Sequence, residues 1–243
     1  MSILILFIAA LLPAALLWGY IWKKDPQKEP TPQLIRAGLY GAGIVLPTAL
    51  VEAGLEAAMF GEVSMPTTLF GSTTTAFFVA AIPEECFKLL ALWLVVRRNP
   101  YFDEHFDGIV YAVCVGLGFA AMENVGYVMS GGDDWVSIAV ARALLSVPGH
   151  YAFAVLMGYY YSLYHFVDRS FRNKVMILLV PILGHGVYDT IAMSTAISPV
   201  IGGVGAILLV VFCLKLHKFA YQKILAQIKR DKTETSIEDW QEA

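Results

Sequence analysis

Two adjacent carboxylates and a lysine lie within an apolar part of the sequence. In a helix, Glu84 shares a face with Lys88 four residues on, and Glu85 lies three residues before the same lysine. A carboxylate among apolar helices has its charged form disfavoured, which suits it to accept a proton as a general base. A nearby ammonium opposes that effect and can keep one carboxylate ionised. The pair can therefore divide into acid and base roles.

Other ionisable residues fall within apolar segments elsewhere in the chain. His185 and Asp189 are four residues apart and share a helix face, whereas His150 and the Glu123-Asn124 pair lie in two further segments. Such residues are costly in a membrane and usually face a bundle interior or a water-filled cavity. The sequence predicts one polar site with catalytic and supporting members, namely Glu84, Glu85, Lys88, Glu123, Asn124, His150, His185 and Asp189.

Prolines accompany three of these polar groups. Pro83 adjoins Glu84, Pro148 precedes His150, and Pro181 lies one turn before His185. A proline frees a backbone carbonyl and can open the helix locally, which would help a site that needs water and hydrogen-bond acceptors. Glu52, Glu56 and Arg142 are interpreted as vestibule or surface charges, with the two glutamates at an outer mouth.

The composition indicates that these residues are held by membrane-spanning helices. Of the 243 residues, 58% are hydrophobic and 15% are charged, against about 45–50% and about 25% in soluble domains. A spanning helix needs about 20 mostly apolar residues. The sequence contains about seven such segments, which predicts an all-α polytopic membrane protein: 2–22, 37–60, 71–96, 107–130, 137–165, 175–193 and 198–217.

The basic residues predict the orientation of these spans. Lysines and arginines follow the first, third, fifth and seventh segments, and the intervening loops near 61–70, 131–136 and 194–197 have none. Because positive residues collect in cytoplasmic loops, the N-terminus is expected outside and the C-terminus in the cytoplasm. We expect one integral-membrane domain over 1–217 and a cytoplasmic amphipathic and acidic tail over 218–243. Asp107 and His105 are expected to cap the fourth span at its cytoplasmic end.

Several familiar chemistries are excluded by missing motifs. The chain has no HExxH helix, no serine motif beside its histidines, and no phosphate-binding loop; the three cysteines form no CxxC pair. A second aspartate typical of aspartyl intramembrane proteases is also missing, because Phe119 follows Gly118. An ion- or proton-coupled transporter, a non-catalytic chaperone, and an internal ion pair that only fixes helix packing remain as alternatives. The absence of internal repeats weakens the transporter.

The order of the motifs resembles a known family. Pro83-Glu84-Glu85-Cys86-Phe87-Lys88 forms an EExxK motif, and Asp107-Gly108 leads through Gly116-Leu117-Gly118-Phe119 to Glu123-Asn124, then His150, then His185-x-x-x-Asp189. This pattern resembles the PrsW intramembrane proteases, which are similar to the CAAX prenyl endopeptidases. The lysine spacing and Asp189 differ from the CAAX pattern and favour PrsW over prenylated substrates.

The resemblance implies an intramembrane endopeptidase of the cell membrane. Its implied substrate is a single-span regulatory protein such as an anti-sigma factor, cut near its extracytoplasmic side, and no nucleic acid is implied. Glu84 would activate water with His150 assisting, while Glu85 and Lys88 tune Glu84. His185 would stabilise the oxyanion, and Asp189 would orient His185 or donate while protonated.

The metal content is left open by the residue types. Two histidines with carboxylates could hold zinc with one open position, but the chain lacks a histidine pair at i,i+4 spacing. A mechanism without a metal cofactor is therefore expected, with zinc as the alternative.

Overall fold

The computed structural model describes the backbone of residues 3–61 and 66–241, and side chains up to residue 234. These ranges contain helices and no strand. Residue 2, the predicted start of the first span, and the side chains at the acidic end of the tail lie outside them.

The first half of the chain forms α1 (Ile3–Lys24), α2 (Thr31–Gly43), α3 (Val45–Phe60), α4 (Leu69–Thr74), η1 (Thr75–Ala81) and α5 (Ile82–Val96). The second half forms α6 (Asp107–Ser130), η2 (Gly132–Asp134), α7 (Trp135–Ala141), η3 (Arg142–Ser146), α8 (Val147–Ser162), η4 (Leu163–Val167), α9 (Phe171–Ser194) and α10 (Pro199–Gln241).

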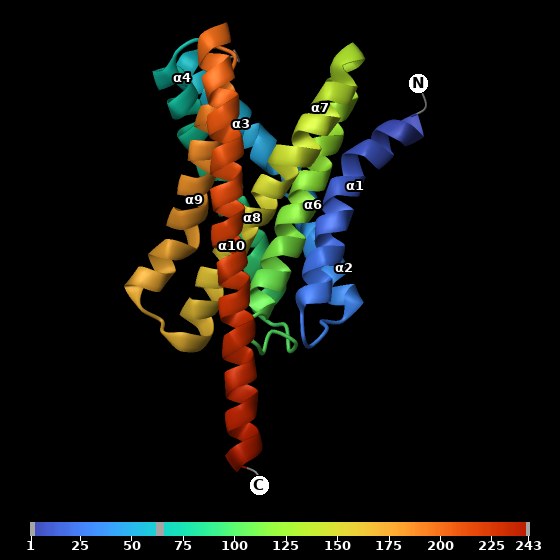
Figure 1. Cartoon of the computed structure of the whole chain (residues 1–243), viewed down its shortest axis with the longest axis vertical. Helices are drawn as coiled ribbons and strands as arrows, with labels where there is room; N and C mark the ends of the chain where they lie inside the picture. Colours follow the sequence, from blue (N-terminus) through green and yellow to red (C-terminus); the bar gives the residue numbers. More distant parts are fainter. Residues whose placement is uncertain (1–2, 62–65, 242–243) are drawn as a thin grey trace.

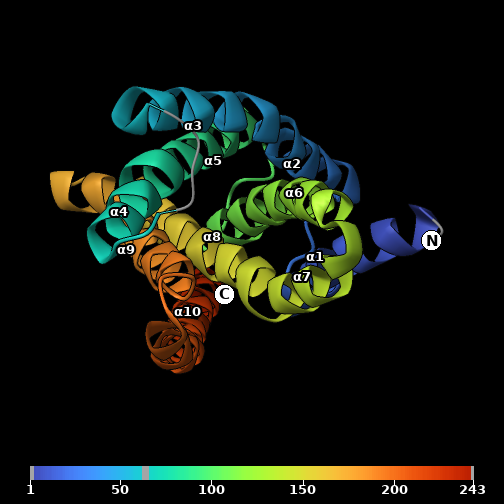
Figure 2. The same cartoon turned by 90° about the horizontal axis from the view of Figure 1, so that it is seen from above.

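Helix α6 is the centre of the bundle. It packs against α1, α2 and α8, and every residue from Asp107 to Leu117 is buried. Seen from above, α1 and α2 lie on one side of α6 and α8 on the other, with α9 and α10 beyond α8 (Figure 2). At one end the bundle divides into two arms, with α3, α4, α9 and α10 in one and α1, α6 and α7 in the other (Figure 1).

Six helical segments of the described chain are long and apolar enough to cross a membrane. They are Ile3–Lys24, Thr31–Phe60, Asp107–Ser130, Gly132–Val167, Phe171–Ser194 and Pro199–Glu234. The predicted span 71–96 is also helical, from Leu69 to Val96, but it carries two glutamates and a lysine of the predicted site, which make it less apolar than the others. The chain is an all-α multi-pass membrane protein, as predicted. That the segment 71–96 also crosses the membrane stays a prediction.

Small residues let the helices approach α6 closely. A Cβ atom at Gly118 would overlap the carbonyl oxygen of Gly38 on α2, and one at Gly116 would lie 2.7 Å from the Cβ of Ala154 on α8. Helices in membranes associate through such small residues because their backbones can then pack tightly. The two glycines therefore allow α6 to pack closely between α2 and α8.

Two of the three prolines follow a π-helical segment. The amide of Ile82 donates to the carbonyl oxygen of Phe77 in η1, and the amide of Val147 donates to Arg142 in η3, each five residues back. Pro83 and Pro148 come directly afterwards. A π-helical turn inserts one residue into the helix and often marks a functional site. The helix therefore departs from regular α-helical geometry before Glu84 and before His150, whereas Pro181 lies inside the regular helix α9. The opening of these helices to water stays a prediction.

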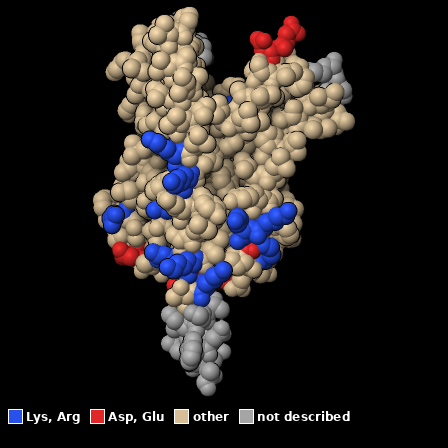
Figure 3. All heavy atoms as spheres, viewed as in Figure 1, with Lys and Arg blue, Asp and Glu red and all other residues tan. Residues whose placement is uncertain are grey.

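Positive charge gathers at one end of the bundle, called here the basic end, where α1 ends at Lys24 and α5 is followed by Arg97 and Arg98. On the face shown in Figure 3, Lys and Arg cluster towards the end from which α10 projects, and an acidic group marks the opposite end. The surface is hollowed between the two arms at that opposite end. This distribution agrees with the predicted orientation, which itself stays a prediction.

Helix α10 continues past the predicted end of its span. It runs without interruption to Gln241 and buries Ala220 and Ile224 against the bundle, so no break in the helix marks the predicted boundary at 217. The carboxylate of Asp231 accepts from the backbone amides of His105 (2.8 Å) and Phe106 (3.0 Å), just before α6 begins. Asp231 therefore caps α6 from the distant helix α10.

The predicted capping by Asp107 and His105 is wrong. Asp107 accepts from the amides of Asp103 and Glu104 in the preceding loop, and the ring Nε2 of His105 contacts Glu234 at 2.8 Å. Neither side chain bonds an amide of the first turn of α6.

Replacing Gly118 with alanine should destabilise the fold. The added methyl group meets backbone of α2, and such overpacking costs about 1–3 kcal/mol. The midpoint of thermal unfolding in detergent micelles checks this, with Gly126→Ala as the matched control. Gly126 lies on the same helix with open space around its Cβ position. Equal unfolding midpoints for the two variants would contradict the proposed close contact.

Candidate active site

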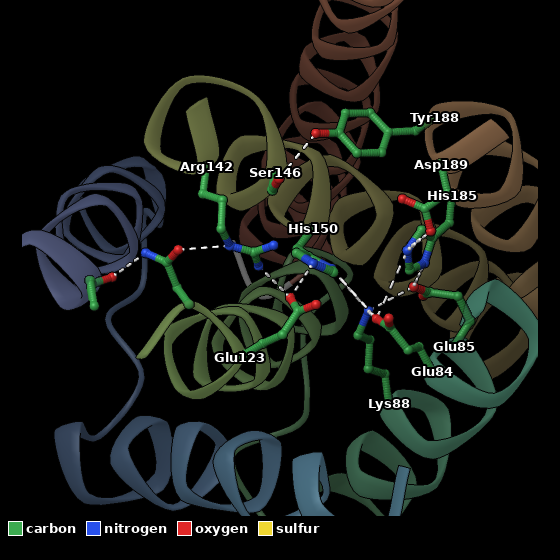
Figure 4. A network of polar contacts seen from close by, with 12 residues as sticks. Glu84, Glu85, Lys88, Glu123, Arg142, Ser146, His150, His185, Tyr188 and Asp189 are labelled. Atoms are coloured by element: carbon green, nitrogen blue, oxygen red, sulfur yellow. Dashed lines mark hydrogen bonds and ion pairs between the residues drawn. The ribbon is translucent and has the colours of Figure 1, made fainter. Parts of the chain in front are cut away.

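The ammonium group of Lys88 lies at the centre of the polar cluster (Figure 4). Its Nζ donates to Glu84 Oε2 at 2.9 Å and to Glu85 Oε1 at 2.8 Å, and lies 3.1 Å from Nδ1 of His150. All four side chains are buried. The ring of Phe119 on α6 supports the same ammonium at 4.4 Å. Two residues of one helix face and one residue of α8 are thus joined through a single cation.

His150 connects Lys88 to helix α6. Its Nε2 lies 2.9 Å from Oε2 of Glu123, opposite the nitrogen that faces Lys88. An ammonium group can only donate, so Nδ1 of His150 accepts and Nε2 carries the proton donated to Glu123. These partners assign the tautomer of His150.

His185 lies between two carboxylates. Its Nδ1 is 2.9 Å from Glu85 Oε1, and its Nε2 is 3.1 Å from Asp189 Oδ2, one turn further along α9. Its ring stacks on Phe153, with centroids 4.8 Å apart. The carboxylate of Glu85 is completely buried and holds both His185 and Lys88, so it positions the other groups instead of facing the cavity.

A cavity of about 570 Å³ opens on the cluster. Its lining includes Glu84, Glu123, His150, His185 and Asp189, but neither Glu85 nor Lys88. Glu84 Oε2 lies 3.9 Å from the nearer nitrogen of each histidine. Glu84 is therefore the carboxylate that contacts the ammonium, approaches both histidines and also reaches the cavity.

The mouth of the same cavity carries further polar residues. Glu52 and Glu56 line it, in agreement with their predicted place. Tyr127 and the hydroxyl pair of Ser146 and Tyr188, whose oxygens are 3.1 Å apart, line it as well. These three hydroxyl residues were not anticipated, because serine and tyrosine are common in spanning helices and carry no distinctive spacing here.

Arg142, which the sequence analysis interprets as a vestibule or surface charge, lines the same cavity and also contacts two of the predicted site residues. Its guanidinium group donates to Glu123 Oε2 at 2.7 Å and to Asn124 Oδ1 at 2.8 Å, and only 12% of the side chain is exposed. Asn124 in turn donates to the carbonyl oxygen of Ala10 on α1 at 2.7 Å. A chain of polar contacts thus links α1 through Arg142 and Glu123 to His150 (Figure 4).

The charges of this cluster do not balance with neutral histidines. Four carboxylates meet two permanent cations, Lys88 and Arg142. Two negative charges remain, and burial makes uncompensated charge costly. Both ring nitrogens of His185 face carboxylates, so an imidazolium there would neutralise one of the two charges. Because His150 is neutral in this arrangement, the described cluster keeps an excess of negative charge.

Comparisons with known proteins agree with the motif pattern. A sequence model described as "PrsW family intramembrane metalloprotease" matches residues 29–216. The chain belongs to the PrsW family. The protein named Protease PrsW from Geobacillus kaustophilus is 35% identical over 188 residues, which cover 76% of this chain and 79% of the relative. The one from Bacillus subtilis is 35% identical over 186 residues, which cover 75% and 80%. The one from Oceanobacillus iheyensis is 34% identical over 184 residues, which cover 75% and 80%.

Family membership confirms the resemblance drawn from the motifs. The chain is a PrsW-family intramembrane protease, a hydrolase of the cell membrane that acts on protein within the membrane. No solved structure matches it. The structure brings seven of the eight predicted site residues into direct contact, and Asn124 joins them through Arg142. The catalytic roles of these residues stay predictions.

Replacing Lys88 with methionine should destabilise the protein strongly. Removing one partner of a buried ion pair leaves an unpaired charge and costs about 3–5 kcal/mol. The loss should be smaller in the double variant Lys88→Met/Glu85→Gln, which removes one carboxylate as well. Thermal unfolding in detergent measures both, with the exposed Lys23→Met as the control. A double variant as unstable as the sum of its single changes would contradict the coupling.

Proposed function

We propose that this protease hydrolyses a peptide bond in the cavity beside Glu84, with that carboxylate taking the proton from the attacking water. The observation that carries the proposal is the position of Glu84. It lines the cavity, while Glu85, Lys88 and both histidines surround it. A general base must lie within hydrogen-bond reach of the water that it activates. Water held by Glu84 would also lie close to both imidazole rings.

The surrounding residues have the other roles in the proposed mechanism. Lys88 orients Glu84, because its ammonium donates to the carboxylate at 2.9 Å. His150 places Lys88 and is itself held by Glu123. Nε2 of His185 would donate to the oxygen that becomes negative as water adds to the carbonyl. Asp189 holds that nitrogen until the substrate arrives.

The cavity suits an extended segment of a membrane protein. The cavity reaches from the cluster to Pro66, which precedes α4, and to Glu56 on α3. The hollow between the two arms of the bundle lies at the end away from the basic residues (Figure 3). We propose a single-span regulatory protein of the anti-sigma-factor type as substrate, cut near its extracytoplasmic side. The support is the site's position towards the predicted outer end and the resemblance stated above.

Glu84→Gln should abolish cleavage while leaving the fold intact. Glutamine keeps the size and the hydrogen bond to Lys88 but cannot accept the proton, and general-base catalysis contributes about 10²–10⁴-fold. The assay follows cleavage of purified single-span substrates in lipid nanodiscs, with mass spectrometry of the products to locate the cut bond. Asp133→Asn, at an exposed position distant from the cavity, is the matched control.

Two results of this assay would refute the mechanism. One is undiminished cleavage by both Glu84→Gln and His150→Ala. The other is a folded wild-type protein that cuts no single-span substrate but moves protons or ions across liposome membranes, which would favour the transporter alternative. A cut far from the predicted outer side would retain the chemistry and reject the proposed orientation of the substrate.

A metal-dependent protease is the second candidate for the catalytic type. The supporting observation is that one ligand atom each from Glu84, His150 and His185 lies within 4.8 Å of the others, from three different helices. Two histidines and a glutamate suit zinc. An ion bound there would have to displace the contact of Lys88 with His150 Nδ1. Bound zinc would polarise the carbonyl group and lower the pKa of its water.

Metal analysis separates the two catalytic types. With Glu84 as the base and no metal, chelator-treated protein should retain its rate of cleavage, and no tightly bound zinc should be found. One zinc per chain that disappears in His150→Ala and His185→Ala, together with activity that returns only when zinc is restored, would instead establish the metal-dependent type. Glu123→Gln serves as a control that perturbs His150 without removing a ligand.

A further inference from the structure

A second cluster of carboxylates lies at the basic end, and none of its residues lines the cavity. One carboxylate oxygen each of Glu29, Asp103 and Asp107 lies within 4.8 Å of the others. Glu29 belongs to the linker between α1 and α2, Asp103 to the loop between α5 and α6, and Asp107 is the first residue of α6. Three separate segments therefore meet through their negative groups.

Two buried carboxyl groups of this cluster approach each other with no donor group between them. Asp107 is completely buried, no donor among the described residues reaches its Oδ1, and its side chain interacts with the carboxyl group of Glu29. The other oxygen of Asp107, Oδ2, accepts from the amides of Asp103 and Glu104 at 3.0 and 2.7 Å. An unsatisfied buried oxygen costs about 1–3 kcal/mol or more when charged, so the pair requires either a shared proton or a bound cation.

The surroundings add negative charge without an ion pair to neutralise it. Asp25 and Glu104 lie close enough to influence Glu29, Asp103 or Asp107 electrostatically. None of the ion pairs formed among the described residues involves any of these five carboxylates. The ammonium of Lys28 donates to the backbone carbonyl oxygens of Trp22 and Asp25 instead. Burial and the neighbouring carboxylates raise the pKa of Glu104 to about 7.

Hydrogen bonds from outside the cluster hold its members in place. The hydroxyl of Tyr111, buried on α6, donates to Oε2 of Glu29, and the two loop amides hold Asp107. Donors of this kind favour the ionised carboxylate and fix its direction. Ligands of metal ions are commonly oriented by such outer partners.

We propose that Glu29, Asp103 and Asp107 form a binding site for a hard divalent cation, Mg²⁺ or Ca²⁺, which clamps the α1–α2 linker to the α5–α6 loop. An all-oxygen carboxylate set suits these ions better than zinc, which favours nitrogen and sulfur. Asp103 is exposed and gives the ion access from water. The bound ion holds the segment that joins α1 to α2 against the segment that joins α5 to α6. This proposal does not depend on the proposed catalytic mechanism.

Calorimetric titration of metal-stripped protein in detergent tests the site with Mg²⁺, Ca²⁺ and Zn²⁺, each added alone. We expect one Mg²⁺ or Ca²⁺ per chain and weaker binding of Zn²⁺ at this position. Glu29→Gln and Asp103→Asn should each weaken binding about tenfold or more, and Tyr111→Phe should weaken it about tenfold through the loss of an outer partner. Asp133→Asn, which alters an exposed carboxylate outside the cluster, should bind as wild type.

Two additions keep the test specific. Titrations in the Glu84→Gln background remove a candidate ligand at the cavity, and binding at the basic end should be unchanged there. The midpoint of thermal unfolding should rise with the bound cation in wild type and not in Asp103→Asn, whose exposed side chain can change without disturbing the core. No one-site binding up to millimolar cation, or equal binding by all variants, overturns the proposal. A midpoint that depends on pH and not on cation would show that Glu29 and Asp107 share a proton instead.

Discussion

The ion pairs of Lys88 with Glu84 and Glu85 are the interaction on which the arrangement of the site depends. Two adjacent carboxylates are not stable among apolar helices unless a cation lies within contact distance. Lys88 supplies that charge from the same helix, at 2.9 and 2.8 Å. Because the ammonium has a third donor left, it also attracts His150 from α8. Helix α5 therefore supplies its own counter-ion, and the third donor of the Lys88 ammonium aligns the neighbouring helix α8 through His150.

The other helices are placed so that this pairing can be completed. Close contacts of α6 with α2 and α8 bring Glu123 to His150, and α9 brings His185 to Glu85. Arg142 then neutralises Glu123 and ties the arrangement to α1 through Asn124. Each buried charge in the described site has a partner on another turn or another helix, which is the general requirement for charge in a membrane protein.

Local spacing made part of this site predictable. The contacts of Lys88 with Glu84 and Glu85, and of His185 with Asp189, follow from three- and four-residue separations within one helix. The all-α membrane fold follows from composition and the lengths of apolar segments. The contact of Glu123 with His150, the inclusion of Arg142, and the capping of α6 by Asp231 depend on how helices cross, and no spacing within one helix encodes such a crossing. The apolar content of 71–96 was harder to assess because Glu84, Glu85 and Lys88 lower it.

The π-helical segment η1, Thr75–Ala81, has a consequence for how related sequences are compared. A π turn holds one residue more than the α-helical turn that it replaces. Deleting a single residue there would restore regular helix and leave the EExxK motif unchanged in the alignment. Because the wider turn absorbs that residue, the flanking residues would keep nearly the same faces, whereas a one-residue deletion in a regular α-helix would rotate one side relative to the other by about 100°. A relative with an intact motif and a one-residue gap in this stretch can therefore carry its two glutamates on the same face, and such a gap alone does not mark an inactive member of the family.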